Sequence, residues 1–314
     1  MKLGKIGVWV ALDGPIGYFE DDRSAELGRA TAPRIAKFAR RVEELGYAAI
    51  WMPDGLGRDP FITSSLLLAS TQDLIAATGI SSIYSRDPVA SAAAAHALNE
   101  WSGGRFIMGL GVSHHRIVEG IRGHQYSKPI SAMRAYLDGM VEAPYHAAPP
   151  AQKTPILLAA LRGKMLELAR DRADGAHPTS VTPHHTRQAR AILGPGKLLC
   201  VGQRLILETD PIKARAIARA ELETNLDLDN YVNSWRAMGF SDADFTNGGS
   251  DHLIDSIVGW GDEKALRKRI QEHLDAGADH VCFKPVAPDR SIDMRIIERL
   301  APDGSQRRSH DCMA

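Results

Sequence analysis

The strongest constraint on the fold of this 314-residue chain is a repeated alternation of short apolar runs with segments of helical periodicity. Residues 6–11 form an almost unbroken apolar run, which is typical of a strand buried on both faces. Residues 35–45 then carry apolar side chains at helical spacing, and Gly46 stands where a glycine commonly ends a helix. Seven further strands are expected at residues 47–52, 79–84, 105–111, 155–160, 173–178, within 198–207 and at 278–285. The other expected helices occupy residues 61–77, 89–101, 164–172, 183–193 and 262–277.

Eight strands that alternate with helices indicate parallel βα units. Such units can close into a (β/α)8 TIM barrel, and a doubly wound open sheet is the alternative that a strand count leaves open. Two stretches, about residues 113–154 and 208–261, are too long for simple connections, so we expect insertions after strands 4 and 7. In a barrel both would rise from the C-terminal face, where active sites lie. We expect one barrel domain over residues 1–304 and a polar, disordered tail over residues 305–314.

Charge and cysteine content narrow the class of protein. The 38 Lys and Arg residues balance 38 Asp and Glu residues, so the chain lacks the net positive charge of most nucleic-acid binders. No apolar run approaches the roughly 18 residues of a membrane helix, and the run at residues 6–11 predicts a strand rather than a signal peptide. The cysteines Cys200, Cys282 and Cys312 are odd in number and far apart, as in proteins of a reducing compartment. We therefore expect a cytoplasmic enzyme that binds neither nucleic acid nor membrane.

Two candidate sites contain glycines at the ends of expected strands. Gly109 and Gly111 precede Ser113 and His114, and such glycines allow the backbone to approach a planar ligand closely. A tight turn and an exposed loop histidine are the alternatives, although a neutral histidine can also hydrogen-bond to a cofactor ring. Gly79 opens the expected strand 79–84, where a glycine marks either a bulge near a ligand or the end of the preceding helix.

Charged residues mark two further candidate sites. Asp54 follows the expected strand 47–52, where a carboxylate can transfer protons or cap a turn. A second site leads from strand 155–160 into a helix, where backbone N–H groups and two cations can hold a phosphate, unless the cations are simply solvated. Its residues are Ala159, Ala160, Leu161, Arg162, Gly163 and Lys164.

The sequence does not indicate a metal site, a hydrolase or a phosphotransferase. The chain has 12 histidines, but adjacent pairs such as His114 and His115 do not easily face one ion, so no metal site is expected. Neither a Gly-x-Ser-x-Gly elbow nor a Walker lysine motif is present.

Several short motifs occur together over residues 5–287. They are Gly46-Tyr47, Trp51-Met52-Pro53, Gly57-Arg58-Asp59-Pro60, Thr78-Gly79-Ile80, Tyr84-Ser85-Arg86-Asp87-Pro88, Ser102-Gly103-Gly104-Arg105-Phe106, Gly109-Leu110-Gly111-Val112-Ser113-His114 and Asp275-Ala276-Gly277-Ala278-Asp279-His280-Val281. With these motifs the chain resembles the luciferase-like monooxygenase superfamily of flavin-type oxidoreductases. It is most similar to the actinobacterial branch that uses the deazaflavin coenzyme F420.

The resemblance implies a TIM-type barrel that forms a homodimer. It also implies a cis peptide bond between Gly79 and Ile80, which forms a bulge behind the central ring of the cofactor. Ser113 and His114 match the family's loop after strand four, and residues 159–164 match its phosphate-binding turn. These residues are the predicted cofactor site.

The chain departs from the family pattern at two places. Many relatives have a glycine-rich turn where this chain has Leu161 and Arg162, so phosphate contact would rely on Arg162, Gly163 and Lys164. Some members carry an Asp-His pair after strand two, but here Gly55 follows Asp54. The role of that histidine is therefore not carried over, and Asp54 and His114 are the candidate catalytic residues.

The resemblance implies hydride transfer between F420 and a small organic substrate. An FMN-dependent monooxygenase is the alternative within the same fold. A non-catalytic barrel that binds cofactor is a third possibility, and the missing histidine after strand two favours it.

Overall fold

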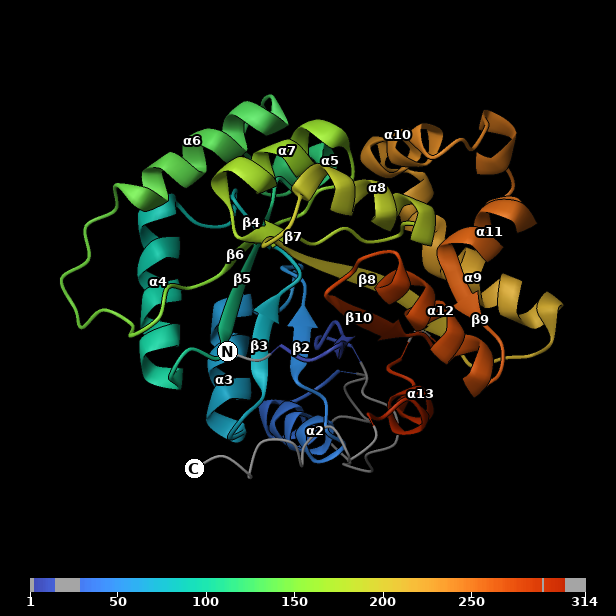
Figure 1. Ribbon diagram of the computed structural model, residues 1–314, viewed down its shortest axis with the longest axis horizontal. Coiled ribbons are helices and arrows are strands. Elements are labelled where there is room, and N and C mark those ends of the chain that lie inside the picture. The colour runs from blue at the N-terminus through green and yellow to red at the C-terminus, as the bar shows by residue number, and fades with distance from the viewer. Residues whose placement is uncertain (1–2, 15–28, 290, 303–314) are drawn as a thin grey trace.

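Eight parallel strands close into a barrel in the computed structural model, which describes residues 3–14, 29–289 and 291–302 (Figure 1). The barrel closes because the last strand pairs with β1 on one side and with β8 on the other, which excludes an open sheet. The predicted (β/α)8 fold is thus confirmed. The barrel strands are β1 (Ile6–Trp9), β2 (Ala49–Met52), β3 (Ile75–Thr78), β5 (Phe106–Gly111), β6 (Ile156–Leu158), β7 (Gly175–Ala176), β8 (Leu198–Ile206) and β10 (His280–Pro285).

Helices surround the barrel, and most of them begin with a proline in the first turn. Proline suits this position because its missing N–H has no partner in a helix start. These helices are α2 (Ala32–Glu44), α3 (Pro60–Ser70), α4 (Pro88–Ser102), α6 (Pro129–Val141), α7 (Gly163–Arg172), α8 (Pro183–Leu193), α12 (Glu263–Asp275) and α13 (Met294–Arg299). Among the described residues, no helix combines the length and apolar character needed to cross a bilayer.

Two long connections carry structure of their own at the carboxyl ends of β5 and β8. The first contains the short helix α5 (His115–Val118) before α6. The second contains α9 (Pro211–Leu226), α10 (Asp229–Ala237), the 3-10 helix η1 (Asp242–Phe245), α11 (Asp251–Ile257) and β9 (Val258–Trp260). Its apolar side chains, among them the fully buried Trp235, form a second hydrophobic core beside the barrel. The expected tail and Cys312 lie outside the described residues.

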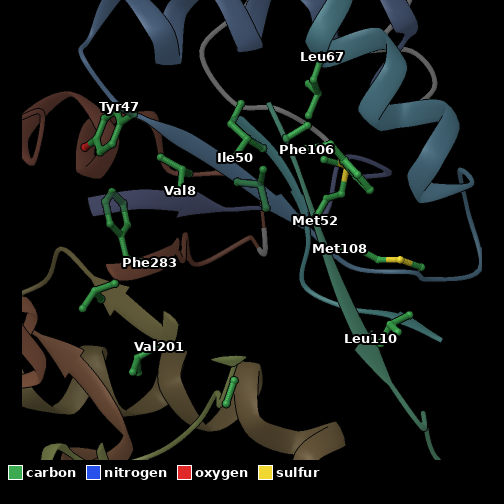
Figure 2. Packing of buried hydrophobic residues seen from close by; sticks show 14 of the residues in the cluster. Val8, Tyr47, Ile50, Met52, Leu67, Phe106, Met108, Leu110, Val201 and Phe283 are labelled. Carbon is green, nitrogen blue, oxygen red and sulfur yellow. The ribbon is translucent and has the colours of Figure 1, made fainter. Parts of the chain in front are cut away.

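Alternate residues of the strands belong to two separate apolar clusters. Val8, Ile50, Phe106 and Phe283 pack in the large cluster that also contains Leu67 of α3 (Figure 2). Their strand neighbours, which include Ala49, Trp51, Ile107, Cys200 and Cys282, form a smaller cluster. Because side chains of a strand alternate between its faces, the first cluster lies between barrel and helices and the second fills the barrel interior.

The third barrel strand lies earlier than the sequence indicates. The helix expected over residues 61–77 is too long, because α3 ends at Ser70 and β3 spans Ile75–Thr78. The strand expected over residues 79–84 contains only the short β4 (Ser81–Ser82) and is not the third barrel strand. The carboxylate of Glu43 in α2 accepts hydrogen bonds from the backbone N–H groups of residues 72, 73 and 74 at 3.0, 2.7 and 2.9 Å. This long-range contact ends the helix, and periodicity alone does not separate a short buried strand from a helix.

Four histidines are buried among the described residues, and burial lowers the pKa of three of them strongly. His177 stacks on Trp51 with 4.7 Å between ring centroids, and His280 Nε2 accepts a hydrogen bond from Trp51 Nε1 at 3.1 Å. His273 of α12 donates from Nε2 to Gln203 Oε1 at 2.8 Å. Burial lowers the pKa of His177 and of His280 to about 4, and that of His273 to about 3. All three are therefore neutral at pH 7.

We expect Glu43→Ala to lower the free energy of unfolding by about 1–2 kcal/mol, because three backbone N–H groups lose a charged acceptor. Urea unfolding measures the change. Glu44→Ala is the matched control, since Glu44 is exposed and forms a long ion pair with Arg41 at 3.7 Å; it should change stability by less than about 0.5 kcal/mol. Equal effects of the two variants would contradict the role of Glu43.

Stability should fall as the pH drops below about 6.5, because the unfolded chain then binds protons that His177, His273 and His280 do not accept in the folded state. Each histidine contributes a slope of up to about 1.4 kcal/mol per pH unit between its unfolded and folded pKa. Urea unfolding at pH 7, 6 and 5 tests this. His273→Gln should flatten the slope, whereas the exposed His184→Gln should not. A slope that His273→Gln leaves unchanged would contradict the assignment.

Candidate functional site

A cavity of about 650 Å³ lies at the carboxyl ends of the barrel strands. Seven of the predicted site residues line it: Asp54, Gly79, Ile80, Ser113, His114, Ala159 and Leu161. They come from the ends of β2, β3, β5 and β6, which the barrel brings to one mouth. Four predicted residues are not part of the lining: Ala160 is buried beside it, Gly163 begins α7, and Arg162 and Lys164 are exposed.

The peptide bond between Gly79 and Ile80 is cis, as the resemblance predicted. It follows β3, and the short strand β4 (Ser81–Ser82) comes directly after it. The carbonyl oxygen of Gly79 accepts a hydrogen bond from Trp9 Nε1 at 2.8 Å, and its N–H donates to the carbonyl oxygen of Met52 at 2.7 Å. Side chain and backbone groups of β1 and β2 thus hold the bulge in place at the cavity.

Glycines of β5 allow this bulge to pack closely on the strand. A Cβ atom on Gly109 would lie 2.0 Å from the carbonyl oxygen of Thr78, and one on Gly111 would lie 2.4 Å from Ile80 Cδ1. Thr78 Oγ1 fixes the contact because it donates to the carbonyl oxygen of Gly109 at 2.7 Å and accepts from its N–H at 2.8 Å. The space that the two glycines leave is therefore filled by Thr78 and Ile80.

The carboxylate of Asp54 is engaged on both oxygens. Oδ2 accepts from the N–H of Ser82 at 3.0 Å and from Ser85 Oγ at 2.5 Å, and Oδ1 pairs with Arg122 Nη2 at 3.2 Å. The backbone N–H of Asp54 donates to the carbonyl oxygen of Ile80 at 2.9 Å. Asp54 therefore ties the end of β2 to the bulge from both its side chain and its backbone.

Ser113 and His114 turn away from β5 toward the second connection. Ser113 has a φ of 56°, a left-handed conformation that is uncommon outside glycine and that clusters at functional sites. The ring of His114 lies 5.8 Å from that of Tyr231 in α10. Burial lowers the pKa of His114, while the neighbouring Asn230 acts in the opposite direction. His114 is therefore a neutral imidazole at the cavity wall.

The turn at residues 159–164 is fixed by three elements. The N–H of Ala159 donates to the carbonyl oxygen of Leu110 at 2.8 Å. The carbonyl oxygen of Leu161 accepts from His185 Nε2 of α8 at 2.8 Å and from Ser234 Oγ of α10 at 3.3 Å. The turn then enters α7, whose first backbone N–H groups lie beside the exposed Arg162 and Lys164.

Sequence reasoning missed the part of the lining that comes from β1, β7, β8, β10 and the second connection. It includes Trp9, His177, Arg204, Tyr231 and Lys284. A charged residue near the end of an apolar strand was a usable signal for Arg204 and Lys284. Their partner Glu221 lies on α9, and no sequence pattern indicates where this helix packs.

The described residues contain no group of three or more His, Cys, Asp or Glu side chains that could hold a metal ion. The arrangement is instead a large pocket with a backbone bulge on one side and a helix start at its rim. Such a pocket suits an organic ligand with a flat apolar part and an anionic part.

Comparison with known proteins agrees with this geometry. A putative coenzyme F420-dependent oxidoreductase of Mycobacterium tuberculosis is 32% identical over 126 residues, which cover 38% of this chain and 36% of that protein. The 5,10-methylenetetrahydromethanopterin reductase of Methanolobus tindarius is 25% identical and covers 84% of this chain and 94% of its own length.

Solved structures with low sequence identity share the fold. The coenzyme F420-dependent tetrahydromethanopterin reductase of Methanopyrus kandleri has a TM-score of 0.67 at 17% identity, over 96% of this chain and 99% of its own. The EDTA monooxygenase of Chelativorans sp. has a TM-score of 0.70 at 14% identity, over 96% of this chain and 93% of its own. Residues 16–280 match the family model described as luciferase-like monooxygenase. Because this match spans most of the sequence, the chain belongs to the luciferase-like monooxygenase family of enzymes.

Proposed function

We propose that this enzyme transfers a hydride between the deazaflavin coenzyme F420 and a small organic substrate. The observation that carries the proposal is the close packing of Thr78 and Ile80 on Gly109 and Gly111, which brings the segment Gly79–Ile80 to the border of the cavity. The Mycobacterium tuberculosis relative supports it, because its name includes coenzyme F420.

The residues present fit such a cofactor. The cavity of about 650 Å³ falls within the range of about 300–1,000 Å³ that is usual for ligand pockets. Ile80 occupies the place that a Cβ atom on Gly111 would take, so the bulge presents backbone and one apolar side chain to the cavity. Val112 and Leu161 add apolar lining nearby. This surface suits one face of a flat ring system.

Each predicted binding residue has a role in this proposal. Gly79 and Ile80 support one face of the ring, and Ser113 and His114 contact its edge. Ala159 and Leu161 line the path to the rim and the buried Ala160 supports them. At the rim, Arg162, Gly163 and Lys164 hold the phosphate by backbone N–H groups and charge. When bound, F420 supplies the ring carbon that gives or takes the hydride, while the protein orients the ring and excludes water.

The two candidate catalytic residues have different parts in this scheme. We assign proton transfer to His114, because a neutral imidazole at the cavity can accept a proton and return it afterwards. Asp54 is better suited to positioning, because Ser82, Ser85 and Arg122 occupy its carboxylate. Its removal would loosen the bulge rather than remove a proton donor.

Two alternatives and one expected partner can be tested directly. The shared fold of the EDTA monooxygenase keeps FMN-dependent oxygenation as an alternative, which oxygen uptake with FMN and a flavin reductase would support. A non-catalytic barrel would bind cofactor but transfer no hydride to any substrate. The homodimer remains a prediction, which light scattering on the purified protein tests.

Purified protein titrated with F420 should show saturable quenching of tryptophan fluorescence, because Trp9 lies at the cavity and bonds to the bulge. We expect F420 to bind at least about tenfold more tightly than FMN, a difference of about 1.4 kcal/mol. Micromolar binding of FMN without binding of F420 would contradict the proposal.

Gly111→Ala tests whether the bulge carries this binding. The added Cβ would lie 2.4 Å from Ile80 Cδ1 and displace the bulge, so F420 affinity should fall about tenfold or more. Gly14→Ala is the matched control, since its Cβ would meet nothing within 4 Å. Equal F420 affinity in the two variants would show that the bulge does not contact the cofactor.

A further inference from the structure

Arg204 and Lys284 line the cavity, and the proposed function gives them no role. They are register partners in the parallel pair of β8 and β10. In the closed ring of eight strands, β8 lies four places from β3, and β10 lies four places from β5. The two cations therefore stand across the barrel mouth from the bulge and from the strand that leads to His114. We call Arg204, Lys284 and the carboxylate that they share the cationic wall.

The shared carboxylate belongs to Glu221 of α9, whose side chain is 8% exposed. Arg204 Nε donates to Glu221 Oε1 at 3.0 Å, and the ammonium group of Lys284 contacts the same oxygen. Burial alone would raise the pKa of Glu221, but the two cations outweigh it and hold the pKa below its usual range. Glu221 is therefore ionised and orients both cations.

Arg204 is held in a fixed orientation with donors to spare. Its Nη2 donates to Asn225 Oδ1 at 3.1 Å, and its Nη1 donates to Ser180 Oγ. A guanidinium has five N–H groups. The contacts of Arg204 with Glu221, Asn225 and Ser180 use three of them. The side chain is 13% exposed and still lines the cavity, so its remaining donors are available to a ligand there.

Lys284 links the wall to the bulge. Its Nζ lies 5.5 Å from the ring centroid of Trp9, the same indole that donates to the carbonyl oxygen of Gly79. A ligand that spans the cavity between the bulge and the wall would therefore contact Trp9. The indole is a local reporter for anything that binds at Lys284.

Charge at the wall differs from charge elsewhere in the lining. Arg116 and Asp227 are exposed and of opposite sign, and Asp54 pairs with Arg122. Burying charged groups costs free energy, and apolar replacements of similar size often stabilise a protein. Two cations around one buried carboxylate therefore cost folding free energy that an apolar cluster of similar size would not. A purely structural role does not account for this cost. Fixed guanidinium and ammonium donors are, however, the usual recognition groups for anionic oxygens.

We propose that the cationic wall binds an anionic oxygen group of the substrate, either a carboxylate or a phosphate. The wall then holds the substrate across the cavity from the bulge, on the side of the cofactor ring that the bulge leaves open. The substrate assignment rests on the proposed function, whereas anion binding is a property of the wall itself.

Titration of the cofactor-free protein with sodium acetate, with inorganic phosphate and with acetamide tests the wall. Ionic strength is held constant, and tryptophan fluorescence is followed with calorimetry in parallel. Acetate or phosphate should bind saturably, and whichever binds more tightly identifies the anionic group. Acetamide has nearly the shape of acetate without its charge and should not bind. Trp9→Phe should reduce the fluorescence response while calorimetry still detects binding.

Two substitutions at the wall should act in opposite directions. Lys284→Met should weaken anion binding about tenfold, because a charged donor is lost. Glu221→Gln should tighten it by about threefold or more, because the carboxylate no longer competes for the two cations. Misfolding cannot produce this gain. Lys153→Met is the matched control, since Lys153 is exposed and precedes β6 at the opposite end of the barrel; it should leave affinity unchanged.

Three results would overturn the proposal: no saturable binding of either anion, weaker binding by Glu221→Gln, or equal losses in Lys284→Met and Lys153→Met. The outcome is independent of the cofactor. If F420 fails to bind while the wall binds acetate or phosphate, only the proposed function is wrong. If F420 binds and neither anion does, only the wall proposal is wrong.

Discussion

The close packing of the segment after β3 against β5 is the contact on which the rest of the site depends. Gly109 and Gly111 make it possible, because a Cβ atom at either position would meet Thr78 or Ile80 at 2.0 or 2.4 Å. Thr78 Oγ1 then bonds to both backbone groups of Gly109. A well-packed region does not deform continuously, so a larger residue at these positions must move the bulge.

The other contacts of the bulge connect it to the neighbouring strands β1 and β2. Trp9 of β1 donates a hydrogen bond to the carbonyl oxygen of Gly79, and Asp54 after β2 donates to that of Ile80. Asp54 also pairs with Arg122 of the first connection. On the opposite side of the mouth, Glu221 orients Arg204 and Lys284. The formal net charge of the chain is zero, yet charge is unevenly placed around this cavity. A backbone surface faces a cationic wall, an arrangement that agrees with our proposal of a flat ring and an anionic substrate in one pocket.

The sequence was sufficient for features that depend on local pattern. The alternation of apolar runs and helical segments predicted parallel βα units but left an open sheet possible, and the family resemblance decided for the barrel and for one shared site. Asp54, His114 and Leu161 do line one mouth. The cis bond was reached only through the family resemblance. The start of β3 was misplaced, because its signal is a carboxylate about thirty residues earlier, Glu43, and not a local turn motif.

Features that depend on contacts between distant residues were out of reach. Glu221 gains its role only when α9 folds back over β8 and β10, and no spacing in the sequence joins it to Arg204 and Lys284. Arg162 and Lys164 were expected beside the ligand but are exposed at the rim, because their backbone N–H groups begin α7 there.

The most direct measurement of the central claim is a crystal structure of the protein with F420 bound. We expect one ring face to lie on Gly79 and Ile80 and the other to face Arg204 and Lys284. A ring that lies against β8 and β10, or outside the cavity, would contradict it.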